Sequence, residues 1–454
     1  MSAALFRLNE HVLPCNHIRE YYRATANEQE DVFHLAIKQY TPLDNLQPKN
    51  GDITIIGAHA NGFPKELYEP LWDELLKRSK KEGFTIRSIW IADVAHQGQS
   101  SELNESKLGN DPNWFDHSRD LLHMINHFRA QMPLPLIGLG HSMGGCQLVN
   151  LSLMHPRLFT TLILVDPVIQ SRVSPKGNFA PAFASARRRD RWPSRSAAKT
   201  AFLKSPFYRA WDPRVLDLWI RFGLRELPTA LYPTSASALS TKSPAPATAE
   251  PTLVPPPERE VTLTTTKHQE VLTFLRSNFT PLDSTPNPLT HPDVPAPANS
   301  LTNQNAFDNI PDPGPQTPFY RPENIIVFHN LPHLRPSVLY IFGSESDLSA
   351  PEFRAQKMAL TGSGIGGSGG AEKGRVKEVV VEGAGHLIPM ERVEESAENV
   401  AGWVGKEIGR WRDEEKVMRE EWEKTEKVNR AKMRPDYEIR LKEEAEKAKA
   451  RSKL

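Results

Sequence analysis

Short apolar runs alternate with longer stretches that carry apolar residues at helical spacing, and this alternation constrains the fold more than any other feature. Strands separated by helices of ten or more residues favour a parallel sheet covered on both faces. An alternating run over 31–42, together with the stretch from Phe6, predicts an opening hairpin. We therefore predict an α/β core over residues 1–170. Its remaining strands are expected at 52–58, 85–92, 134–139 and 160–165, and its helices at 69–81, 113–128 and 144–154.

The alternation breaks after Pro167, and residues 171–330 are predicted to form an inserted cap. Within the cap, 234–257 and 281–315 are rich in Pro, Ser and Thr and hold few apolar residues that could pack. The island Val261–Phe279 has helical spacing and is expected to return to the cap. A second part of the core is predicted over 331–408, followed by a charged helical tail over 409–454.

Composition and charge exclude several function classes. The net charge of +1 provides no global field for holding nucleic acid. Cys15 and Cys146 are too few for a disulfide framework or a paired-cysteine zinc site, and His123 and His127 lack the Glu of the zinc-protease pattern, so we expect no metal. The longest apolar runs fall short of the ~20 residues of a membrane span, and we expect no transmembrane helix.

The motif Gly140-His141-Ser142-Met143-Gly144-Gly145 lies between a predicted strand and a predicted helix. A nucleophile on so tight a turn needs small residues two before and two after it, and glycines occupy both positions. The helix N-terminus places the Met143 amide where an oxyanion would form. We therefore predict that Ser142 is a nucleophile.

A serine hydroxyl needs a base, and His386 follows the last predicted strand in Glu382-Gly383-Ala384-Gly385-His386. Its position suits a side chain that folds over the carboxyl edge of the sheet. Ser142 and His386 together indicate nucleophilic catalysis without a cofactor.

These motifs, with His59-Ala60-Asn61-Gly62-Phe63, make the chain resemble the α/β-hydrolase fold serine hydrolases over about residues 1–230 and 320–408. More narrowly, it is similar to fungal peroxisomal hydrolases that include a yeast peroxisomal lipase and enzymes of host-selective toxin biosynthesis. The resemblance implies an α/β-hydrolase fold, a mostly parallel sheet with helices on both faces and an inserted helical cap.

The resemblance also implies the order Ser, acid, His. It favours Asp347 as the acid, with Asp166 as the alternative and Glu345 as a third choice. The usual Gly-x-x-Asp spacing is one residue longer here, because Ser346 stands third after Gly343. The oxyanion donors implied are the amides of Met143 and Phe63, with Asn61 as the fallback to Phe63.

We therefore expect a serine esterase or lipase-like hydrolase that cleaves a carboxylic ester, either a lipid ester or an acyl thioester, through an acyl-serine intermediate. An acyltransferase of the same fold and a non-catalytic binding protein are the alternatives. Trp211, Leu216, Trp219 and Phe222 would line an acyl pocket or form the cap–core interface. Ser452-Lys453-Leu454 matches the signal read by the peroxisomal import receptor and predicts the peroxisomal matrix.

Overall fold

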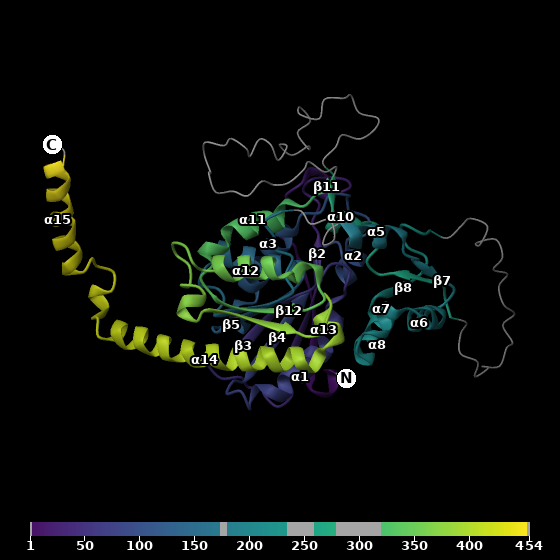
Figure 1. Cartoon of the computed structure of the whole chain (residues 1–454), viewed down its shortest axis with the longest axis horizontal. Coiled ribbons are helices and arrows are strands. Elements are labelled where there is room, and N and C mark those ends of the chain that lie inside the picture. Colours follow the sequence, from purple (N-terminus) through teal and green to yellow (C-terminus); the bar gives the residue numbers. More distant parts are fainter. Residues whose placement is uncertain (1, 173–178, 234–257, 278–318, 452–454) are drawn as a thin grey trace, which may run out of the picture. The chain divides into compact units, whose positions relative to one another are not determined.

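The computed structural model describes residues 2–172, 179–233, 258–277 and 319–451 (Figure 1). Its centre is an eight-stranded sheet in the order β1-β2-β4-β3-β5-β6-β12-β13. The hairpin β1–β2 and the β2–β4 pair are antiparallel, and every later pair is parallel, which confirms the predicted mostly parallel sheet. The strands are β1 (Phe6–Pro14), β2 (His34–Pro42), β3 (Ile53–Ala58), β4 (Ile86–Ala92), β5 (Leu136–His141), β6 (Thr161–Val165), β12 (Ser337–Gly343) and β13 (Val376–Val381).

Helices cover both faces of this sheet. On one face α4 (Met143–Met154) packs against both α3 (Trp114–His127) and α11 (Pro322–Asn330), and α12 (Pro351–Leu360) lies beside β13 (Figure 1). On the other face lie α1 (Glu69–Ser79) and the start of α14 (Val393–Glu423), where the Trp403 indole donates to Thr161 Oγ1 of β6 at 2.8 Å. The carboxyl ends of the parallel strands thus share one edge, which is where sites form in such sheets.

Several boundaries differ from the prediction. β5 begins two residues later, because Pro135 has no amide hydrogen to donate to a strand ladder, and it runs on to His141. In the second part of the core, a short helix α13 (Ile388–Glu391) directly precedes α14. Helix α11 was not predicted, because it directly follows the Pro-rich stretch. Pro322 lies in its first turn, where the backbone amides have no partner within the helix, so the missing amide hydrogen of proline breaks no hydrogen bond.

The cap contains the predicted helices and a small sheet that sequence reasoning missed. Strands of two or three residues are too short to show alternation. The island over 261–279 is divided between strand and helix, and the two Pro-rich segments lie outside the described residues. The elements are α5 (Ala180–Arg187), β7 (Arg191–Trp192), α6 (Arg195–Lys204), α7 (Pro206–Arg209), α8 (Pro213–Phe222), β8 (Leu224–Glu226), β9 (Val261–Leu263) and α10 (Lys267–Phe274).

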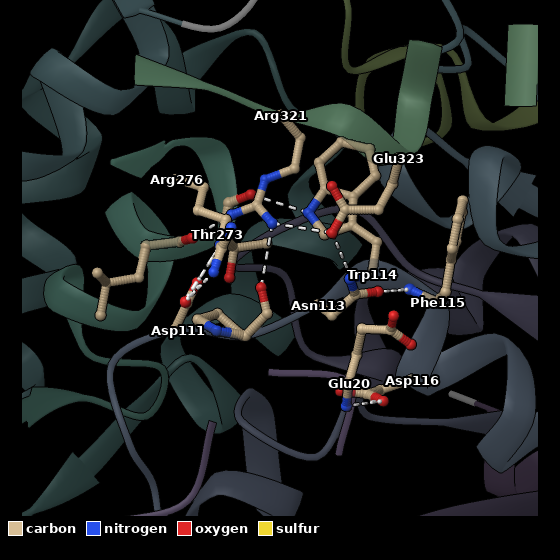
Figure 2. A network of polar contacts seen from close by, with 12 residues as sticks. Glu20, Asp111, Asn113, Trp114, Phe115, Asp116, Thr273, Arg276, Arg321 and Glu323 are labelled. Carbon is tan, nitrogen blue, oxygen red and sulfur yellow. Dashed lines mark hydrogen bonds and ion pairs between the residues drawn. The ribbon is translucent and has the colours of Figure 1, made fainter. Parts of the chain in front are cut away.

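A buried polar network fastens the end of α10 to the core (Figure 2). The Arg276 guanidinium pairs with Asp111 at 2.7 Å, and the Trp114 indole donates to the carbonyl of Thr273 at 2.8 Å. Arg321, fully buried, pairs with Glu323 at 3.0 Å. Because a buried charge is stable only with a partner, these contacts fix α10 against the segment that leads into α3.

Residues 406–454 form a second compact unit by themselves. They hold the rest of α14 and α15 (Pro435–Arg451), which has no buried residue and matches the expected solvated, charged helix. Within the described ranges, none of the helices is both long and apolar enough to cross a membrane.

Candidate active site

Ser142 occupies a strained turn between β5 and α4. Its φ is 58° and its ψ is −118°, a conformation that side-chain-bearing residues rarely adopt. A Cβ on Gly140 would lie 2.6 Å from the carbonyl oxygen of Gly144, and a Cβ on Gly144 would collide with the Ala58 carbonyl. The two glycines therefore permit the sharp turn that the sequence predicted, and the turn presents the hydroxyl at the carboxyl edge of the sheet.

His386 links this serine to a carboxylate. It lies between β13 and α13, where the Ser142 hydroxyl donates to its Nε2 at 2.8 Å and its Nδ1 donates to Asp166 Oδ2 at 2.6 Å. Hydrogen positions in this chain follow from the partners: an acceptor-only carboxylate requires the proton on Nδ1. The result is a Ser–His–Asp arrangement capable of nucleophilic catalysis.

The carboxylate in this arrangement belongs to the second-choice residue of the sequence prediction. Asp166 ends β6, with its amide bonded to the carbonyl of Ile341 at 2.7 Å, and its side chain is fully buried. Asp347 instead begins a 3₁₀ turn and is exposed, and Glu345 is exposed as well. The structure thus brings Asp166, the alternative acid of the sequence prediction, rather than the preferred Asp347, to His386 Nδ1.

Two serines of the loop after β12 hold the Asp166 carboxylate. Ser346 donates to Oδ2 at 2.5 Å, and Ser349 donates to Oδ1. Burial by itself would raise the pKa of Asp166, but the hydrogen bonds from His386, Ser346 and Ser349 outweigh burial and lower that pKa. Ser346 is the third residue after Gly343, the position at which the family pattern has its acid. In this chain the residue at that position donates a hydrogen bond to Asp166 instead.

The amides near Ser142 differ in what they bind. Met143 is the first residue of α4, and its amide donates no hydrogen bond among the described residues. The Phe63 amide donates to the carbonyl of Ala60 at 3.2 Å, whereas the Asn61 amide is without an acceptor in the described ranges. Of the two candidates for the second oxyanion donor, Phe63 therefore has the amide that already donates in a turn, and Asn61 has the amide without a backbone acceptor in the described ranges.

A second histidine, His141, is hydrogen-bonded to the backbone of His386. The Tyr68 hydroxyl donates to His141 Nδ1 at 2.9 Å, and His141 Nε2 donates to the carbonyl of His386 at 2.9 Å. Burial, with the nearby His386, lowers the pKa of His141 to about 3, so it stays uncharged near neutral pH. Tyr68 in turn accepts the Ala60 amide at 2.9 Å. Sequence reasoning used His141 only as part of the serine motif, and no local signal marks it as a support for His386.

The cap reaches the loop after β3 through aromatic and polar contacts. The Phe63 ring lies edge-on to Trp211 at 5.6 Å and to Trp219 at 6.1 Å between ring centroids. The Asn61 side-chain amide donates to the carbonyl of Glu270 on α10 at 3.0 Å. The cap residues singled out in the sequence therefore lie at the cap–core interface and next to the loop that holds Asn61. Trp211, Leu216 and Trp219 are buried, and Phe222 is half-buried.

Metal-binding groups are not assembled in this region. Across the described part of the chain, no cluster of three or more His, Cys, Asp or Glu residues could hold a metal ion. His123 and His127 lie on the exposed side of α3 with ring centroids 6.4 Å apart. Cys15 and Cys146 are buried free thiols.

The fold and this geometry agree with the comparisons to known proteins. The family model described as the alpha/beta hydrolase family matches residues 55–402, and the chain belongs to that family. It is therefore a hydrolase.

Among its relatives is a protein of Penicillium brevicompactum named type I acyl-CoA thioesterase mpaH'. The two chains are 43% identical over 428 residues, which is 93% of this chain and 92% of the relative. A type I acyl-CoA thioesterase mpaH of Penicillium roqueforti is 42% identical over 431 residues, again 93% of this chain and 92% of the relative. The crystal structure of the peroxisomal alpha-beta-hydrolase Lpx1 of Saccharomyces cerevisiae shares the fold at a TM-score of 0.62 with 14% identity, covering 99% of both chains.

Proposed function

We propose that this chain hydrolyses acyl-CoA thioesters through an acyl-serine intermediate, with Ser142 as nucleophile, His386 as general base and acid, and Asp166 as the acid that orients His386. The hydrogen-bonded series from Ser142 Oγ to Asp166 Oδ2 is the observation that carries the proposal. The thioester substrate is supported by relatives that are matched over 92% of their length and are named acyl-CoA thioesterases.

The steps follow from the positions of these groups. Ser142 Oγ attacks the thioester carbonyl carbon while His386 Nε2 takes its proton, and the Asp166 carboxylate stabilises the resulting imidazolium. The amides of Met143 and Asn61 donate hydrogen bonds to the oxyanion of the tetrahedral intermediate. The C–S bond then breaks, His386 returns its proton to the thiolate of coenzyme A, and the acyl group stays on Ser142.

Water completes the cycle by the same route. His386 takes a proton from a water molecule that attacks the acyl-serine ester, and the collapse of the second intermediate returns the proton to Ser142 Oγ. The products are a carboxylic acid and free coenzyme A. A thiolate leaves more readily than an alkoxide. Activated esters such as p-nitrophenyl esters also have a good leaving group, so the same residues would cleave them as well.

Release of free thiol from acyl-CoA substrates of increasing chain length tests this function. We expect turnover by the wild-type protein and by Ser344→Ala, a control in the loop after β12 whose hydroxyl accepts the Gly383 amide. Ser142→Ala should lose turnover by several orders of magnitude. Turnover of p-nitrophenyl esters without any turnover of acyl-CoA would contradict the thioester assignment and leave an esterase.

We also propose that the chain acts in the peroxisomal matrix, with Ser452-Lys453-Leu454 read by the import receptor. These residues lie outside the described ranges, and the support is their match to the signal together with the exposed α15 before them. The yeast hydrolase of the same fold is itself described as peroxisomal. A fluorescent fusion with this tripeptide free should be punctate and co-localise with a peroxisomal marker, and removal of Leu454 should make it diffuse. A diffuse intact fusion would contradict the proposal.

A further inference from the structure

The cap carries an excess of positive charge that the proposed chemistry does not use. Residues 187–226 hold 11 Lys and Arg residues against 4 Asp and Glu residues, in a chain whose net charge is only +1. Several of these cations are neutralised by acids: Arg188 by Glu270, Arg191 by Glu260, Lys199 by Asp217, Arg214 by Asp212 and Arg225 by Glu105.

Other cations of the cap have no acidic partner within the described part of the chain. Arg187, Arg189, Lys204 and Arg209, which we call the basic cap surface, are exposed. The first two lie against aromatic rings, Arg187 over Phe183 at 5.2 Å and Arg189 over Trp192 at 5.7 Å. A group of exposed cations without acids attracts an anionic ligand more strongly than one that is already neutralised.

Contacts inside the cap join the segments that carry these cations. The Arg188 guanidinium donates to the hydroxyl of Tyr208 at 3.3 Å, so the segment that carries Arg187 and Arg189 contacts α7, which carries Arg209. The Tyr208 ring also packs on Phe202 at 4.5 Å, two residues before Lys204.

The same contacts lead from the basic cap surface to the candidate active site. Arg188 binds both carboxylate oxygens of Glu270, at 2.8 and 3.0 Å, and the carbonyl of Glu270 accepts the side-chain amide of Asn61. Arg188 and Glu270 therefore connect the segment that carries Arg187 and Arg189 to the loop that holds Asn61.

We infer that the basic cap surface binds the 3′-phosphorylated ADP portion of the acyl-CoA substrate. This inference rests on the proposed thioesterase function and adds the site for the leaving group. The pantetheine arm holds the phosphates many bonds away from the thioester, so they must be recognised at a distance from Ser142. Exposed Phe183 and Phe207, at 64% and 52% of their full accessible area, supply rings on which an adenine could stack.

Two thioesters that carry the same acyl group, one on coenzyme A and one on N-acetylcysteamine, which has no phosphate, test the inference. The variant is Arg187→Glu/Arg209→Glu. The control is Lys373→Glu/Lys377→Glu, a matched charge reversal at exposed positions before and early in β13, away from the carboxyl end of that strand.

For the cap variant we expect KM for acyl-CoA to rise about tenfold, since each exposed charge pair contributes up to about fivefold. Its kcat, and all its constants for the N-acetylcysteamine thioester, should stay at the wild-type values. The rise of KM with salt should also flatten in this variant. The control should behave as wild type with both substrates. Equal losses on both thioesters, or an unchanged KM for acyl-CoA, would overturn the inference.

A separate result would identify failure of the function itself. If the wild-type protein cleaves p-nitrophenyl esters but neither thioester, the thioesterase proposal fails, and titration with coenzyme A alone then decides the surface. Binding that the cap variant loses upholds the site, and lack of binding by the wild-type protein overturns it. Binding to anionic lipid vesicles that the variant loses, with KM for acyl-CoA unchanged, would assign the surface to a membrane and also overturn it.

Discussion

Removal of the serine hydroxyls around Asp166 should cost both stability and turnover. Each hydroxyl donates to a carboxylate that is fully buried, so no bulk water replaces a donor that is removed. A hydrogen bond to a charged group contributes about 1.5–3 kcal/mol. We therefore expect Ser346→Ala to destabilise the fold by about 2 kcal/mol, and the double variant with Ser349→Ala to lose about 3–5 kcal/mol.

Turnover should fall because the carboxylate loses the groups that fix its position. His386 is oriented by Asp166 through a single hydrogen bond of 2.6 Å, and small displacements of a catalytic group cost up to about 10² in rate. We expect kcat of the double variant to fall about 10- to 100-fold, with KM nearly unchanged. Ser344→Ala, in the same loop, is the matched control.

The pH dependence separates this account from a simple packing defect. The folded-state pKa of Asp166 is lowered, so its contribution to stability is present above the unfolded value of about 4 and is lost as pH falls through the folded value. The stability gap between wild type and the double variant, measured by urea denaturation, should be largest above about pH 5 and shrink in acid. A gap that does not depend on pH, or a double variant with wild-type kcat, would refute the reasoning.

Further substitutions test the acid, the cap anchor and the cap insertion. Asp166→Asn should lower kcat by up to about 10⁴ with the fold intact, whereas kcat of Asp347→Asn should stay within a few-fold of wild type. A larger loss of kcat in Asp347→Asn than in Asp166→Asn would indicate Asp347 as the acid. Asp111→Asn removes the carboxylate that Arg276 pairs with and should cost about 3 kcal/mol in chemical denaturation, while an unchanged midpoint would show that the pair is not needed. Replacement of 234–257 by a short Gly/Ser linker should leave Tm within a few degrees, because β8 and β9 pair on either side of it and closure entropy varies slowly with loop length; insoluble protein would contradict this.

The positions of Ser142 and His386 could be predicted because their sequence signals are local. Ser142 needs glycines two before and two after it and a strand and a helix around it, and all of these are visible in the sequence. His386 follows the last strand of the sheet, and this position can be recognised by counting the strands predicted from the sequence. The parallel sheet was predictable for the same reason, since strand–helix alternation requires no knowledge of distant contacts.

The carboxylate that contacts His386 could not be chosen from the sequence, because the choice depends on tertiary placement. Asp166 and Asp347 both follow strands of the sheet, β6 and β12, which are neighbours. The deciding facts are the burial of one carboxylate and the serine donors that converge on it from the other loop. The loop after β3 shows the same limit. The pair Gly62-Phe63 favoured Phe63 as an oxyanion donor, but in the structure the Phe63 amide donates to the carbonyl of Ala60.

The rate of fluorophosphonate labelling, with the labelled peptide identified by mass spectrometry, tests the central claim most directly. The account predicts one modified residue, Ser142, no labelling of Ser142→Ala, and a labelling rate that falls by orders of magnitude in Asp166→Asn but not in Asp347→Asn, because only Asp166 supports His386. Modification of another residue, or labelling of Ser142 at the wild-type rate in Asp166→Asn, would contradict it.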